Sequence, residues 1–196
     1  MGETTPHLRE EGREYLRRTV VLVGMMGAGK TAVGRALAAR LGVEMRDSDA
    51  EIEASSQLSI AEIFDRYGEP FFREKESAVI ARLLDGPPCI LSTGGGAWMS
   101  AANRAVLTSR AAVVWLQADL EVLWSRVRHK TTRPLLRTRA PKATLTALYA
   151  EREPVYALAP VKVAVQPNWS IEETAEQVMA QLALSGAVDG YVKDEK

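Results

Sequence analysis

A glycine-rich segment near the N-terminus has the residue types and spacing of a phosphate-binding loop. It reads Gly-Met-Met-Gly-Ala-Gly-Lys-Thr from Gly24 to Thr31 and matches the pattern G-x-x-x-x-G-K-[ST]. Glycines let backbone N–H groups curl around a polyphosphate, and a following helix N-terminus adds unpaired donors and partial positive charge. Lys30 can reach terminal phosphates, and the Thr31 hydroxyl can complete a magnesium shell. The segment therefore predicts nucleotide binding through Gly27, Ala28, Gly29, Lys30, Thr31 and Ala32.

Two carboxylates, Asp47 and Asp49, follow a short run that reads as a second strand. If the backbone is still extended there, positions i and i+2 project to the same side, and both carboxylates face the phosphate loop. One can then hold magnesium, and the other can accept a hydrogen bond from a hydroxyl that is to be phosphorylated. The structural alternative makes Asp47 the end of a strand and Asp49 the cap of a helix over residues 50–54.

Three consecutive glycines, Gly94, Gly95 and Gly96, follow a third apolar run. Because glycines cost order in the folded state, we expect a purpose, namely close approach of the backbone to an anionic acceptor. Arg73, Arg133 and Arg152 are candidates for clamping a carboxylate or phosphate, since a guanidinium offers a bidentate, permanently charged fork. The alternative for the three glycines is an ordinary strand-to-helix loop, and the alternative for each arginine is a surface charge without a ligand.

The elements that must position these residues alternate between apolar runs and amphipathic segments. Expected strands cover residues 19–23, 43–47, 89–93, 111–116 and 161–165, and expected helices cover 30–41, 59–67, 70–84, 101–109, 119–127, 142–156 and a last segment capped by Ser170. This alternation predicts an α/β fold, with a five-stranded parallel sheet covered by helices on both faces. Ligands of such sheets bind at the carboxyl ends of the strands, so the three segments above should converge there.

Bulk properties narrow the class of protein. The 196 residues are 46% hydrophobic and 26% charged with zero net charge, which is typical of a globular domain and indicates neither a nucleic-acid nor a membrane partner. Residues 122–150 hold seven Lys or Arg and no acidic residue, but they lack the interleaved aromatic residues of a nucleic-acid surface. No apolar run approaches the roughly 20 residues of a spanning helix, and residues 1–18 do not resemble a secretory signal. We therefore expect a cytoplasmic enzyme.

Several motifs follow one another along the chain: the phosphate loop followed by Val33-Gly34-Arg35, Asp47-Ser-Asp49 with Ile52-Glu53, Ile63-Phe64, Gly68-Glu69, Phe72-Arg73, Ser92-Thr-Gly-Gly-Gly96, Arg133-Pro-Leu-Leu136, Glu151-Arg152, Pro154 and Tyr156. With these motifs in this order, about residues 18–182 resemble the bacterial shikimate kinase family. The phosphate loop alone marks a superfamily. The triple glycine, the Arg133–Leu136 segment and the Asp47/Asp49 pair are together more specific.

This resemblance implies a P-loop kinase fold with a mobile lid, and ATP-dependent phosphorylation of the 3-hydroxyl of shikimate in aromatic amino acid biosynthesis. It implies that Lys30 contacts the transferring phosphate, that Thr31 and Asp47 hold Mg²⁺, and that Asp49 is the base and hydroxyl ligand. Arg73 and Arg152 would bind the carboxylate, assisted by the backbone of Gly95 and Gly96, with Gly94 also at the substrate and Phe64 and Phe72 as pocket walls. Arg133, a catalytic residue of the lid, would close over the phosphates, and Arg126 would lie along the adenine.

The same resemblance implies a kinase domain over residues 18–182, with substrate-binding helices at about 48–84 and a lid at about 126–141. Residues 1–17 and 183–196 lie outside the resemblance, and we expect them to be a flexible extension and a flexible tail. Shikimate and ATP are the expected ligands of a monomeric enzyme.

Three other functions share the phosphate loop. A gluconate or nucleoside monophosphate kinase would not require the triple glycine with two arginines for a carboxylate. A GTPase-like switch would need a guanine-reading N-K-x-D segment, which is absent, although Asp65–Gly68 fits D-x-x-G. A catalytically idle nucleotide-binding module is disfavoured by intact Lys30, Thr31, Asp47 and Asp49.

Overall fold

Five parallel strands form the central sheet of the computed structural model, which describes residues 15–129 and 134–190. Their order is β3-β4-β2-β5-β6, with bounds Met45–Asp47, Ile90–Ser92, Val20–Val23, Ala112–Gln117 and Val161–Ala164. The central strand β2 is hydrogen-bonded to β4 on one side and to β5 on the other. The predicted five-stranded parallel sheet is confirmed.

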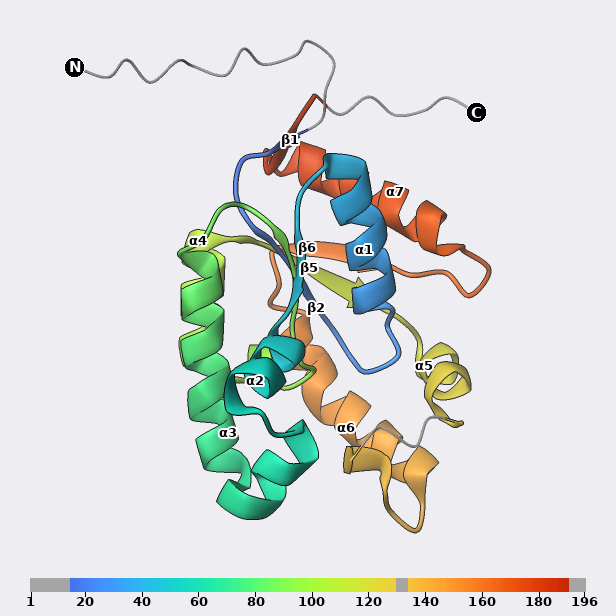
Figure 1. Ribbon diagram of the computed structural model, residues 1–196. Helices are drawn as coiled ribbons and strands as arrows, with labels where there is room; N and C mark the ends of the chain where they lie inside the picture. The colour runs from blue at the N-terminus through green and yellow to red at the C-terminus, as the bar shows by residue number, and fades with distance from the viewer. Residues whose placement is uncertain (1–14, 130–133, 191–196) are drawn as a thin grey trace, which may run out of the picture.

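Helices cover both faces of this sheet, which confirms the three-layer αβα prediction (Figure 1). The helices α1 and α7 lie together on one side of the sheet, and α3 and α4 lie together on the other. The bounds are α1 Lys30–Leu41, α2 Ser48–Ser56, α3 Ile60–Leu84, η1 Ala97–Met99, α4 Ala101–Arg110, α5 Leu120–Val127, η2 Pro134–Leu136, α6 Pro141–Tyr156 and α7 Ile171–Leu184.

The four residues of β2 explain why this strand is central. Val20 to Val23 are all apolar, three are β-branched, and each is at most 1% exposed. A strand that is apolar at every position has no face suited to water, so it is buried between two helical layers. The phosphate loop therefore leaves the sheet at its middle.

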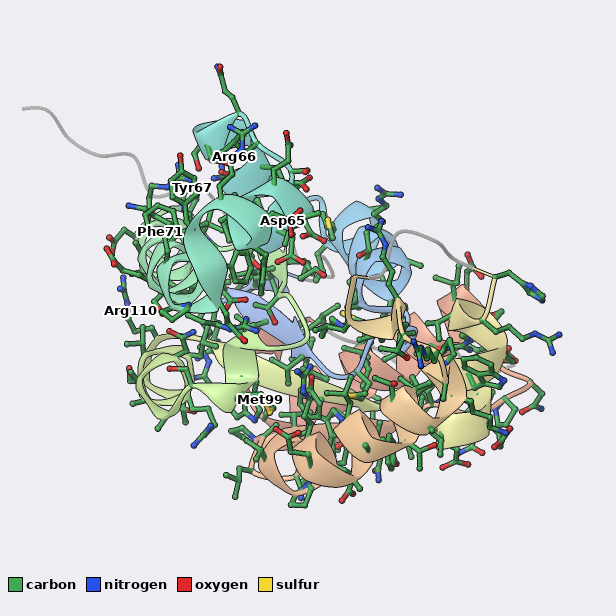
Figure 2. The ribbon with its side chains drawn as sticks, turned by 90° about the horizontal axis from the view of Figure 1, so that it is seen from below. Asp65, Arg66, Tyr67, Phe71, Met99 and Arg110 are labelled. Carbon is green, nitrogen blue, oxygen red and sulfur yellow. The ribbon has the colours of Figure 1, made fainter. Side chains whose placement is uncertain are left out.

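Local signals also place the helix boundaries. Ser59 with Glu62, and Ser170 with Glu173, form complete capping boxes at the starts of α3 and α7. Gly68 has φ 80° and ψ 171°, which interrupts α3 and divides it into the two predicted segments. Seen from below, the stretch of α3 that carries Asp65 to Phe71 lies on the opposite side of the molecule from α5 and α6 (Figure 2). Asp65 thus belongs to a helix, where D-x-x-G would have no switch role.

The folded region extends further at both ends than residues 18–182. The short strand β1, Tyr15–Leu16, pairs antiparallel with β7, Val188–Asp189. Gly186 adopts a left-handed φ of 68° after α7 and turns the chain back, which buries Ala187 and Val188. Residues 183–190 are therefore not a loose tail as expected. Among the described residues, no helix is long and apolar enough to cross a membrane.

Candidate active site

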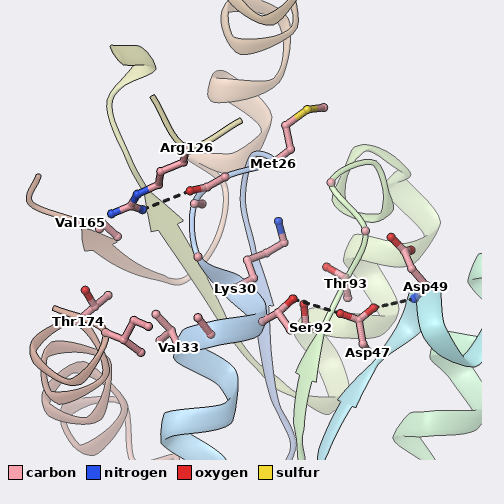
Figure 3. Close-up of a pocket in the computed structure, with 18 of the residues that line it drawn as sticks. Met26, Lys30, Val33, Asp47, Asp49, Ser92, Thr93, Arg126, Val165 and Thr174 are labelled. Carbon is pink, nitrogen blue, oxygen red and sulfur yellow. Dashed lines mark hydrogen bonds between the residues drawn. The ribbon is translucent and has the colours of Figure 1, made fainter. Parts of the chain in front are cut away.

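The strand order reverses at β2: the chain first adds β3 and β4 on one side of β2 and later adds β5 and β6 on the other side. In such sheets the loops on either side of this position separate and leave a crevice at the carboxyl ends. A cavity of about 530 Å³ lies there (Figure 3). Of the predicted site residues it is lined by Gly27, Ala28, Gly29, Lys30, Thr31, Ala32, Asp47, Asp49, Gly94, Gly95 and Arg126.

The phosphate loop requires glycine for two reasons. Gly24 and Gly27 have φ values of 142° and 86°, which L side chains rarely adopt. A carbon added to Gly24 would also lie 2.8 Å from the carbonyl oxygen of Leu116. The Lys30 ammonium lies across the loop and donates to the carbonyl oxygens of Gly24, at 2.8 Å, and Met25, at 3.1 Å. The Lys30 ammonium and the N-terminus of α1 therefore face the cavity together.

Asp47 has two structural partners at the end of β3. Its Oδ1 accepts hydrogen bonds from the backbone N–H groups of Asp49, at 3.0 Å, and Ala50, so Asp47 is the N-cap of α2. Its Oδ2 accepts from the hydroxyl of Thr31 at 3.4 Å (Figure 3). A carboxylate and a hydroxyl beside a polyphosphate site are the donor set that Mg²⁺ takes in nucleotide enzymes, so these residues fit that ion.

Asp49 reaches the cavity by a different route from the expected one. The backbone is not extended from residue 47 to residue 49, because α2 begins at Ser48 and places Asp49 in its first turn. The expected alternation of side chains therefore does not apply, and the cap is Asp47 rather than Asp49. Both carboxylates nevertheless line the cavity side by side (Figure 3), and an acidic side chain is favourable in the first turn of a helix.

The triple glycine is explained by close approach and not by backbone conformation, since none of the three residues has positive φ. A carbon added to Gly94 would lie 2.6 Å from Oδ1 of Asp49, and one added to Gly96 would lie 2.5 Å from Nη1 of Arg73. At Gly95 the nearest groups are the Tyr156 hydroxyl, at 3.6 Å, and Nη1 of Arg152, at 3.8 Å. The loop is thus enclosed by one carboxylate and two guanidinium groups.

Glu76 is a site residue that the sequence interpretation missed. It is 0% exposed, and its Oε2 accepts from Nη1 of Arg73 at 2.8 Å, while Glu69 accepts from the other edge of the same guanidinium. Burial raises the pKa of Glu76, and the neighbouring charge of Asp49 acts in the same direction, against the attraction of Arg73. The i, i+3 spacing of Arg73 and Glu76 on α3 was the available signal.

Arg152 is held from below the loop. It is 9% exposed, and its Nη1 donates to the carbonyl oxygen of Gly95 at 3.4 Å. No atom of the described residues accepts a hydrogen bond from its buried Nε. One turn later on α6, the Tyr156 hydroxyl donates to the same carbonyl oxygen. A buried guanidinium with donor capacity beside a half-buried glycine backbone is suited to an anion.

The remaining predicted residues fall into three groups. Phe64 and Phe72 are in contact, with ring centroids 4.8 Å apart, and both lie on α3, the helix that also carries Arg73. Arg126 donates to the carbonyl oxygen of Gly27 at 3.2 Å and lines the cavity beside the phosphate loop. Arg133 lies outside the described residues.

The cavity has a further wall, beyond the phosphate loop, that no sequence motif indicated. It is contributed by the connection from β6 to α7 and by the first turns of α7, and it consists of Val165, Trp169, Ser170, Ile171 and Thr174. Ser170 was predicted to cap the last helix and does so, but only the structure shows that this helix end lines the same cavity as the phosphate loop.

Comparisons with known proteins agree with this arrangement. A family model described as shikimate kinase matches residues 26–183. The shikimate kinase of Ruegeria pomeroyi is 60% identical over 172 residues, covering 88% of each chain, and that of Cereibacter sphaeroides is 58% identical, covering 89% of each chain. A solved structure described as shikimate kinase from Acinetobacter baumannii in complex with shikimate superposes with a TM-score of 0.80 at 39% identity, covering 86% of this chain and 94% of that chain.

Proposed function

The chain belongs to the shikimate kinase family, and we infer from this premise and from the site that it transfers the terminal phosphoryl group of ATP to the 3-hydroxyl of shikimate. One observation supports the site assignment most strongly. The glycine loop Gly94–Gly96 has Asp49 against one end and the guanidinium groups of Arg73 and Arg152 against the rest. The proposed hydroxyl ligand thus lines the same cavity as the phosphate loop, and the proposed carboxylate clamp adjoins that cavity at the glycine loop.

Asp49 is the proposed base for the attacking alcohol. The 3-oxygen of shikimate forms a bond to the γ-phosphorus while the bond from that phosphorus to the oxygen bridging to ADP breaks, and the hydroxyl proton passes to Asp49. Asp49 lies beside the phosphate loop, as this in-line transfer requires. The chain's part is positioning and charge neutralisation, and no covalent phosphoenzyme forms.

Arg73 and Arg152 are the proposed carboxylate ligands of shikimate. They come from different helices, α3 and α6, and meet at the glycine loop. Glu69 and Glu76 hold the Arg73 guanidinium from two sides, while the Gly95 carbonyl holds one end of Arg152. A guanidinium fixed in this way loses little further freedom when the acid binds. Phe64 and Phe72 supply the apolar wall for the ring.

Thr31 and Asp47 are the proposed magnesium ligands, directly or through water. Their oxygen atoms lie 3.4 Å apart at the start of α1, where a nucleotide's phosphates would bind. Magnesium would neutralise charge on those phosphates. Lys30 would exchange the carbonyl oxygens of Gly24 and Met25 for phosphate oxygens, and it would add a second positive charge.

The nucleotide's base is proposed to lie between Arg126 and the wall formed by the β6–α7 connection. Residues 126–141 are the proposed lid, in which Arg133 would reach the phosphates. Closure of this segment would exclude water that could otherwise hydrolyse ATP.

An acceptor panel tests the reaction. ADP release with ATP and Mg²⁺ is measured with shikimate, with gluconate, with AMP and without acceptor. We expect release to depend on shikimate and to fall to the background rate with gluconate or AMP. Equal release with all acceptors would contradict the proposed substrate, and release with AMP alone would indicate a nucleoside monophosphate kinase.

A further inference from the structure

Tyr156 is buried beneath the glycine loop, and no step described above uses it. It lies on α6, is 1% exposed, and stacks on Trp115 with ring centroids 6.2 Å apart. Its hydroxyl donates to the carbonyl oxygen of Gly95. Burial raises the pKa of Tyr156 far above its ordinary value, although the charge of Arg152 opposes that shift. The hydroxyl therefore keeps its proton, and with it its ability to donate, throughout the physiological pH range.

The bond to Gly95 determines the direction of a neighbouring donor. The peptide between Gly95 and Gly96 is trans, and a trans peptide is planar with C=O and N–H on opposite sides. The Gly95 oxygen accepts from the Tyr156 hydroxyl and from Nη1, one end of the Arg152 guanidinium, so the Gly96 N–H lies on the opposite side of the peptide from these two donor atoms. Gly96 adjoins Arg73, the second guanidinium of the proposed carboxylate clamp.

Glycines on both sides of this peptide make its orientation easy to lose. Neither Gly95 nor Gly96 has a side chain that restricts rotation about the bonds flanking the peptide. Rotation of this peptide by half a turn would exchange the positions of its C=O and N–H groups. A carbonyl oxygen would then lie where an N–H donor is needed for an anion. That oxygen would repel a carboxylate, so a fixed orientation is required for binding.

We propose that Tyr156 is a positioning residue that holds the Gly95–Gly96 peptide with its N–H toward the carboxylate of the bound acid. The inference rests on the proposed position of that carboxylate beside Arg73, Arg152 and Gly96. Tyr156 itself does not contact the acid. It keeps the one acceptor of this peptide out of the substrate's carboxylate site.

Tyr156→Phe removes the hydroxyl and keeps the ring stacked on Trp115. We expect the Kd for shikimate to rise about tenfold, because the hydrogen bond that fixes the orientation of the Gly95–Gly96 peptide is lost. The Kd for ATP should change less than about twofold, and kcat at saturating shikimate less than about threefold, because the carboxylate contact is equal in ground and transition states. Tyr149→Phe, on the same helix, is the matched control and should change none of these values.

A direct readout follows the Gly96 amide. The chain has 14 glycines, so protein labelled with ¹⁵N-glycine gives a sparse amide spectrum. Saturating shikimate should move the Gly96 resonance strongly in the wild type and much less in Tyr156→Phe. If Tyr156→Phe does not fold, 4-methylphenylalanine and 4-aminophenylalanine at residue 156 provide a pair of similar size, of which only the second donates. The amine should restore the wild-type Kd.

The outcomes separate the two proposals. An unchanged Kd for shikimate in Tyr156→Phe, or equal losses for shikimate and ATP, would overturn the positioning role. Equal Kd values for the amine and methyl variants would do the same. If the Gly96 resonance does not respond to shikimate even in the wild type, then the proposed position of the carboxylate is wrong.

Discussion

A methyl group on Gly94 would lie 2.6 Å from Oδ1 of Asp49, so the missing side chain of Gly94 makes room for that carboxylate. Gly94 has no positive φ, and the clashing atom ends a side chain that can move. Gly94→Ala should therefore fold, but with Asp49 displaced. We expect kcat to fall about 10²–10⁴-fold in Gly94→Ala because the proposed base is displaced, and we expect a fall of the same size in Asp49→Asn, which removes the base. Initial rates at saturating substrates and the melting temperature measure the two effects.

Gly86→Ala is the control for this substitution. An added carbon there meets only the carbonyl oxygen of Leu83, at 3.5 Å, which is ordinary contact. Its turnover should match the wild type. Wild-type turnover in Gly94→Ala would contradict the claim that Gly94 leaves the room that Asp49 needs. Wild-type turnover in Asp49→Asn would contradict the assignment of Asp49 as the base.

Arg152→Ala should weaken shikimate binding without weakening ATP binding. The guanidinium is buried, and it donates to a backbone carbonyl beside the proposed carboxylate site. Truncating one partner of a buried charge pair costs about 2–5 kcal/mol of binding free energy. Calorimetric titration with each ligand measures the effect, and Arg110→Ala, which breaks only a surface pair with Asp85, serves as the control. Equal losses for both ligands would contradict the assignment of Arg152 to shikimate.

Substitutions at Asp47 should separate its two roles. Asparagine caps helices as well as aspartate does, so Asp47→Asn should keep the start of α2, whereas Asp47→Ala should cost about 1 kcal/mol of unfolding free energy. Both variants lose the carboxylate that faces Thr31. The Mg²⁺ concentration for half-maximal rate should rise about tenfold or more in both. An unchanged magnesium requirement in either variant would contradict Asp47 as a ligand.

Glu76 should make stability depend on pH. Because burial raises its folded pKa above 4.5, the native state holds the Glu76 proton more tightly than the unfolded chain does. The unfolding free energy therefore contains a favourable contribution near pH 4.5 that is lost as pH rises through the folded pKa. Denaturant unfolding of wild type and Glu76→Gln from pH 4.5 to about 8 measures the difference. Wild type should lose stability relative to the variant as pH rises; a constant or opposite trend would contradict the raised pKa.

Features encoded in short stretches of sequence were predictable. The phosphate loop, the capping boxes at Ser59 and Ser170, and the break at Gly68 each depend on neighbouring residues, and all are present. The continuous apolar runs that became β2, β4 and β5 likewise predicted a parallel sheet, since strands of this kind must be buried on both faces.

Features that depend on distant residues were not predictable. Glu76 on α3 is buried next to Gly94, which lies in the loop after β4, where an added carbon would lie 3.1 Å from Oε1 of Glu76. No local pattern indicates this contact between distant segments. Asp49 was placed by an assumed extended backbone, but the cap that Asp47 provides starts α2 one residue after β3. The pairing of β1 with β7 joins residues more than 170 positions apart, for which two-residue strands leave no pattern.

The most direct test of the account is a crystal structure with shikimate and a nonhydrolysable ATP analogue bound together. We predict the shikimate carboxylate within hydrogen-bond distance of Arg73 and Arg152, and its 3-hydroxyl between Asp49 and the γ-phosphate. A carboxylate bound away from both guanidinium groups, or a 3-hydroxyl directed away from the nucleotide, would contradict the proposed site.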